Sequence, residues 1–144
     1  MYRIINSLAT AEFNKKIGAV EVNFLGLGDA YQYQESLDIA TNIALMYDTK
    51  RWLFSKKLFE DISEKKFLMH IQSWYQRFSH YSADGMNAGC TVVLLTSVAS
   101  ATLIKSLWED QTESMLGCFD LKVFTSKDEV HDYFIGESNK MLTI

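Results

Sequence analysis

Residues 90–96 read Cys90-Thr-Val-Val-Leu-Leu-Thr96, and this stretch decides the fold class. It is apolar without alternation and β-branched at its centre. A strand without a polar face must be covered on both sides, which is typical of a parallel sheet with helices on its faces. Ser97 and Ser100 follow the stretch as candidate caps of a helix. The sequence therefore predicts an α/β protein built around a buried strand.

On both sides of residues 90–96, the sequence alternates between strand and helix patterns. Asp29 is expected to cap a helix with a reciprocal bond from Gln32, because apolar residues then recur at steps of three and four up to Tyr47. The expected strands lie over 1–8, 17–25, 50–54, 90–96 and 119–124. The expected helices run over 29–47, from a cap at Ser63 or Asp61 to before Gly85, from 97 to Gly117, and from 126 to Gly136. The first two strands are close enough in sequence to pair antiparallel.

This order predicts one mixed, mostly parallel sheet of about five strands flanked by four helices. We expect a single domain over residues 1–144, with a loose tail over 137–144 after Gly136. The chain has 144 residues, which suits one core.

Composition excludes several classes of function. A net charge of −4 with scattered Lys and Arg argues against nucleic-acid binding, and no apolar stretch reaches the length of a membrane span. Cys90 and Cys118 are not at metal-ligand spacing, and their small number predicts a reduced, cytoplasmic protein. His70, His80 and His131 lie on separate stretches, so we expect no metal site and no cofactor.

Two segments resemble a known family. The segment Lys50-Arg-Trp-Leu-Phe-Ser55, followed by a loop and Ile62-Ser-Glu-Lys, is similar to the strand, loop and second helix of SpoIIAA-like (STAS-like) domains. The ending Leu121-Lys-Val-Phe-Thr-Ser-Lys-Asp-Glu-Val130 resembles the closing strand and helix of that family. The resemblance implies a small mixed sheet flanked by helices that serves as a regulatory interaction module.

The resemblance also implies a candidate site at Ser63. In the anti-anti-sigma members of the family, a serine at the start of the second helix is phosphorylated and switches partner binding. Those members carry an Asp-Ser-x-Gly signature, whereas this chain has Asp61-Ile-Ser-Glu64. Ser63 is therefore either a phosphoacceptor or an ordinary helix cap, and capping alone explains a serine there.

Aromatic residues crowd the strand over 50–54, its loop and the following helix, and Phe59, Trp74 and Phe78 are among them. One interpretation is a bulky core layer. The alternative is an exposed apolar groove for a partner helix, a second copy of the chain or a small apolar ligand.

Another candidate, Gly26-Leu-Gly-Asp29, has the location of a phosphate-binding loop but lacks the remaining glycine and the lysine of the known fingerprints, so a plain turn is expected.

These observations favour a non-catalytic regulatory module that binds another protein, either an unidentified partner or itself as a homodimer. The alternative is a carrier or sensor of a small, lipid-like apolar ligand. We expect no enzymatic activity, because no group of residues offers a nucleophile, its base and a stabilising donor together.

Overall fold

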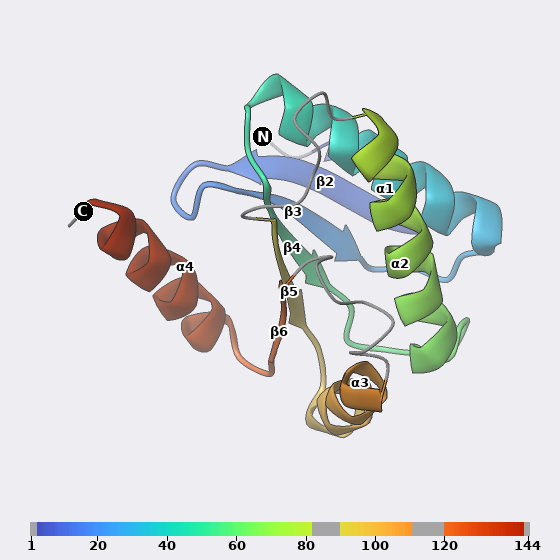
Figure 1. Ribbon diagram of the computed structural model, residues 1–144. Coiled ribbons are helices and arrows are strands. Elements are labelled where there is room, and N and C mark those ends of the chain that lie inside the picture. Colours follow the sequence, from blue (N-terminus) through green and yellow to red (C-terminus); the bar gives the residue numbers. More distant parts are fainter. Residues whose placement is uncertain (1–2, 82–89, 111–119, 143–144) are drawn as a thin grey trace.

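The structure is a computed structural model that describes residues 3–81, 90–110 and 120–142 (Figure 1). Its strands are β1 (Arg3–Ile4), β2 (Ala9–Asn14), β3 (Ala19–Phe24), β4 (Arg51–Ser55), β5 (Thr91–Leu95) and β6 (Asp120–Phe124). Its helices are α1 (Ala30–Met46), α2 (Glu64–Tyr81), α3 (Val98–Asp110) and α4 (Lys127–Leu142). The expected helix end at Gly117 and the residues Gly85 and Cys118 lie outside the described residues.

The strands form one sheet in which spatial order equals sequence order, β1-β2-β3-β4-β5-β6. The pairs β1–β2 and β2–β3 are antiparallel, and β3 to β6 run parallel. This confirms the α/β class with a mixed, mostly parallel sheet and four helices. The sheet has six strands when the two-residue β1 is counted.

The helices divide unequally between the two faces of the sheet (Figure 1). Helices α1, α2 and α3 cover one face, because each connects neighbouring parallel strands and right-handed crossovers in one direction place their helices on one side. Helix α4 follows the last strand and packs on the other face, where Val130 and Phe134 contact Leu53, Val93 and Leu95.

The stretch over residues 90–96 is covered on both faces, as its sequence predicts. All five residues of β5 are buried. Val92 and Leu94 belong to the larger core under α1 and α2, whereas Val93 and Leu95 belong to the core under α4. The strand lacks a polar face because both of its faces are covered.

The expected first strand over 1–8 is wrong in extent. Arg3 and Ile4 form a short strand, and the strand that pairs fully with β3 is β2. Between them the Asn6 side-chain oxygen accepts hydrogen bonds from the N–H groups of Leu8 (2.8 Å) and Ala9 (3.0 Å). An asparagine that bonds the backbone two and three residues ahead makes a turn, which ends the strand early.

The expected loose tail over 137–144 is also wrong for most of its length, because α4 continues through Gly136 to Leu142. Gly136 has no positive φ, so it does not act as a left-handed helix terminator. A glycine inside a helix weakens it without ending it.

Gly26 and Gly136 differ in how much space surrounds them, so substituting each by alanine gives a matched test. A Cβ at Gly26 would lie 2.2 Å from the backbone oxygen of Ser7, where β3 ends beside the turn after β1, whereas a Cβ at Gly136 would meet nothing within 4 Å. We expect Gly26→Ala to lower the free energy of unfolding by about 1–3 kcal/mol, and Gly136→Ala to raise it by about 0.5–1 kcal/mol. Urea unfolding followed by circular dichroism measures both, and equal effects would contradict the close approach at Gly26.

Candidate functional site

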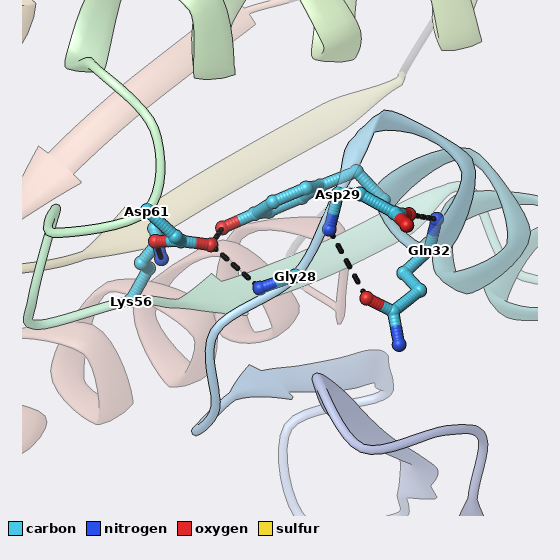
Figure 2. Close-up of polar contacts among 6 residues, drawn as sticks. Gly28, Asp29, Gln32, Lys56 and Asp61 are labelled. Atoms are coloured by element: carbon cyan, nitrogen blue, oxygen red, sulfur yellow. Dashed lines mark hydrogen bonds and ion pairs between the residues drawn. The ribbon is translucent and has the colours of Figure 1, made fainter.

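Two loops meet at the carboxyl ends of the parallel strands, residues 25–29 after β3 and residues 56–63 after β4, and a single carboxylate joins them. Asp61 Oδ1 lies 3.1 Å from Lys56 Nζ. Asp61 Oδ2 accepts hydrogen bonds from the Tyr33 hydroxyl (2.7 Å) and the Gly28 N–H (2.9 Å), and Figure 2 shows these contacts. The carboxylate therefore ties the β4–α2 loop to the β3–α1 loop, to α1 and to the end of β4.

This ion pair is buried. The side chain of Lys56 is 1% exposed and that of Asp61 is 6% exposed. The ammonium of Lys56 also lies 5.4 Å from the Tyr33 ring centre and 5.1 Å from the Phe59 ring centre, so aromatic faces complete its surroundings. Each charge has replaced its hydration with a specific partner, as buried charges require.

The pKa values of the network suit a structural role. Burial by itself would raise the pKa of Asp61, but hydrogen bonds from Tyr33, Gly28 and Lys56 outweigh it and hold that pKa below its ordinary value. Burial, reinforced by the adjacent Asp61 carboxylate, raises the pKa of Tyr33 far above its ordinary value. Tyr33 therefore remains a hydrogen-bond donor, and Asp61 remains an acceptor with both of its oxygens engaged.

The backbone amides of the first loop are also engaged. The Gly26 N–H donates to the Leu8 carbonyl (3.0 Å), and the Gly28 N–H donates to Asp61. These two groups are not offered to an external phosphate, which favours the plain turn expected from the sequence. The predicted cap of α1 is confirmed: Asp29 accepts from the Gln32 N–H (2.9 Å) and the Gln32 side chain accepts from the Asp29 N–H (3.0 Å) (Figure 2).

The outer side of the two loops is apolar. Leu25, Leu27 and Leu58 are 79%, 62% and 65% exposed, which is unusual for large aliphatic side chains. They line a hollow of about 480 Å³ at the carboxyl ends of β3 and β4. Lys57, Glu60 and, from the first turn of α4, Lys127 line it as well. In open α/β sheets, ligands commonly bind in a crevice outside the carboxyl ends of the strands.

Ser63 lies at the other end of the β4–α2 loop and caps α2. Its hydroxyl accepts a hydrogen bond from the Lys66 N–H (3.2 Å), and its carbonyl accepts from the Phe67 N–H (2.9 Å). The helix-cap interpretation is therefore confirmed. Ser63 is exposed, and its role as a phosphoacceptor stays a prediction.

The predicted aromatic surface of Phe59, Trp74 and Phe78 is wrong for two of its three residues. Trp74 is 1% exposed and Phe78 is 4% exposed, so they belong to the core. Trp74 packs edge-on against Trp52 (5.1 Å between ring centres) and donates its indole N–H to Thr41 (2.6 Å). Phe59 is half-buried, because its ring packs on Phe67 (5.5 Å) and against the Lys56 ammonium. The core-layer interpretation is confirmed for Trp74 and Phe78.

The cysteine and histidine side chains that the structure describes do not come together in one site. Cys90 is buried, and burial raises the pKa of its thiol to about 12, which keeps it protonated. His70 stacks on Tyr33 (5.8 Å) and His131 is exposed on α4. Across residues 3–81, 90–110 and 120–142, no three His, Cys, Asp or Glu side chains are grouped so that they could hold a metal ion. Nor does that part of the chain contain a helix with the length and apolar character needed to cross a membrane.

Comparison of the chain with protein-family models, with curated proteins and with solved structures finds no match.

Sequence reasoning missed the centre of this site. The sequence does not indicate that Lys56 pairs with Asp61, because a lysine directly after a strand is ordinarily solvent-exposed. Spacing could not show that Tyr33, 28 residues before Asp61, supplies the second bond. One signal was present: three leucines (25, 27 and 58) occur in the two loops, where polar residues are usual.

Removing one charge of the buried pair tests the network. We expect Asp61→Asn to lower the free energy of unfolding by about 3–5 kcal/mol, because it leaves the Lys56 ammonium buried without a counter-charge. The matched control is Asp38→Asn, which breaks the exposed pair with Arg77 (3.2 Å) and should have an effect below about 1 kcal/mol. Adding Lys56→Met to Asp61→Asn should restore part of the lost stability. Equal losses in Asp61→Asn and Asp38→Asn would show that the pair is not buried in solution.

The same carboxylate predicts a pH dependence. The pKa of Asp61 is lower in the folded protein than its ordinary value of 3.8, so its stabilisation is present above about pH 4 and is lost as the pH falls through the folded pKa. We expect the unfolding free energy, measured in urea from about pH 7 downward, to fall less steeply below about pH 4 in Asp61→Asn than in the wild type. Parallel curves for the two proteins would contradict the lowered pKa.

Proposed function

We propose that this protein is a non-catalytic regulatory interaction module of SpoIIAA-like type, which binds a protein partner through the hollow at the carboxyl ends of β3 and β4. The observation that carries this proposal is the trio of exposed leucines, Leu25, Leu27 and Leu58, on two loops that the buried Asp61 carboxylate joins. Large aliphatic side chains gathered around a hollow and flanked by charged residues are typical of protein-binding surfaces.

The contacts that hold the β4–α2 loop favour a preformed binding surface. Lys56, Phe59 and Asp61 point inward and anchor the β4–α2 loop, while Lys57, Leu58 and Glu60 face outward. A surface that is held in its binding conformation loses less entropy when a partner docks.

The core favours this role over a carrier of apolar ligands. The space between the sheet and α2 is filled by aromatic rings in mutual contact, with Trp52, Phe54, Trp74 and Phe78 separated by 5.1–6.0 Å between ring centres. Interiors packed in this way have little room for a lipid-sized molecule.

The resemblance to SpoIIAA-like domains agrees with the observed element order and with the place of Ser63 as the cap of α2. In this proposal the exposed Ser63 hydroxyl and the leucine-lined hollow lie at opposite ends of one loop, residues 56–63. A phosphate on Ser63 would add charge at one end of the surface that contacts the partner.

A pair of leucine substitutions tests the proposal. We expect Leu58→Asp, in the tagged full-length protein, to abolish capture of the partner from an extract of the source cells, because a charge at the hollow must be desolvated on binding. The matched control is Leu103→Asp, at an exposed leucine of α3 that does not line the hollow, which should capture the same protein as the wild type. Quantitative mass spectrometry of the captured proteins provides the measurement.

Circular dichroism first establishes that both variants are folded, so that a change in the captured proteins reports on binding. A protein that is lost with Leu58→Asp and kept with Leu103→Asp supports the hollow as the binding surface. A captured set that is identical for the wild type and both variants overturns it. A lipid-sized adduct in the native mass of the wild-type protein would instead support the carrier function.

A further inference from the structure

Strand β6 ends the sheet, and among the described residues no strand pairs with its outer edge. Its inner edge bonds to β5: the Asp120 N–H donates to the Cys90 carbonyl (3.4 Å), and the Phe124 carbonyl accepts from the Thr96 N–H (3.0 Å). Because hydrogen-bonding direction alternates along a strand, the backbone groups of Leu121 and Val123 point outward. These groups can bond to another extended strand.

The side chains of β6 carry a charge pattern that selects such a strand. Lys122 is paired in register with Val93, so Asp120 and Lys122 lie on the α4 face, and they are 59% and 46% exposed. Leu121 is paired with Val92 and lies on the α3 face. Strand β6 thus carries one negative and one positive side chain, two residues apart on the same face. Within the strand the Lys122 ammonium lies 3.6 Å from the Asp120 carboxylate, and both groups remain exposed enough to contact a second copy.

We propose that β6 pairs antiparallel with β6 of a second copy of this chain, around a twofold axis at Leu121. An outward-pointing Leu121 would then face the partner copy's Leu121 as a hydrogen-bonded pair. In this register Asp120 stands opposite Lys122 of the second copy, and Lys122 stands opposite its Asp120, which gives two cross-strand ion pairs. The result is one continuous sheet through two molecules.

The charges also exclude the neighbouring register. Sliding one strand by two residues keeps the outward groups paired, with Leu121 opposite Val123, but it places Lys122 opposite Lys122 of the other copy. Like charges directly opposite each other are destabilising in antiparallel pairs, whereas opposite charges stabilise. The pattern Asp120-Leu-Lys122 is therefore complementary to itself in the proposed register.

A groove beside β6 accommodates the added strand. A hollow of about 310 Å³ lies between α3 and β6, lined by Lys105, Trp108, Leu121 and Phe124 among others. The second copy's leucine would enter this space from the edge and add apolar contact to the backbone hydrogen bonds. This interface is separate from the leucine-lined hollow after β3 and β4, so either proposal can fail without the other.

Single charge-reversal variants of β6, and the double variant that restores opposite charges, test the proposal. The association constant is measured by sedimentation equilibrium of the full chain between about 1 µM and 1 mM. We expect the wild type to dimerise, and Lys122→Asp or Asp120→Lys alone to weaken the dimer at least about tenfold, because each turns two attractive pairs into repulsive ones. The double variant Asp120→Lys/Lys122→Asp restores both pairs and should return the constant to near the wild-type value. Lys15→Asp, at the exposed β2–β3 turn, makes the same charge change away from β6 and should have no effect.

Three results would overturn the interface: a wild-type chain that stays monomeric throughout, a dimer that is indifferent to the single reversals, or a double variant that is weaker than both singles. A disulfide test fixes the register independently. In a Cys118→Ser background, Leu121→Cys should form an intermolecular disulfide on mild oxidation, since hydrogen-bonded antiparallel residues have Cα atoms about 5.5 Å apart. Failure of this variant to cross-link, while it remains folded and dimeric, would place the axis elsewhere and overturn the proposal.

Discussion

The buried contact between Lys56 and Asp61 is the constraint on which the functional end of this protein depends. Both side chains are withdrawn from water, so each charge requires the other, and moving either end of the β4–α2 loop away would leave a charge unpaired. Tyr33 and Gly28 add two donors to the same carboxylate, which links α1 and the β3–α1 loop to the pair. Replacing a buried ion pair by apolar residues is often neutral in stability, so we assign to this pair the placement of the loops.

The position of the pair follows from the topology. Parallel strands that succeed one another in one direction bring the ends of β3 and β4 side by side, and their connecting loops emerge at the same edge. One loop supplies the glycine amide and the other supplies the carboxylate. The close approach of Gly26 to Ser7 fixes the first loop from the opposite side. The exposed leucines are therefore presented by a frame that is tied at several points.

The two faces of the sheet differ in how they are covered. The face under α1 and α2 is a continuous aromatic core, whereas α4 covers part of the other face with a smaller apolar cluster. Beyond that cluster, polar side chains such as Glu21 and Asn23 lie on the sheet. The hollow at the carboxyl-end loops and the hollow beside the β6 edge share no lining residue, so the two proposed surfaces do not overlap.

The sequence alone determined the order of elements, the class of the sheet, the caps at Asp29 and Ser63, and the burial of β5, because periodicity and capping act over a few neighbouring residues. It misjudged the extent of the first strand and the end of α4, where a turn at Asn6 and a tolerated glycine at Gly136 decided the outcome. Only the tertiary structure decided between a core layer and an exposed groove for Trp74 and Phe78, and only it showed that Lys56 meets Asp61. Both outcomes depend on how side chains pack in three dimensions, which local sequence patterns do not reveal.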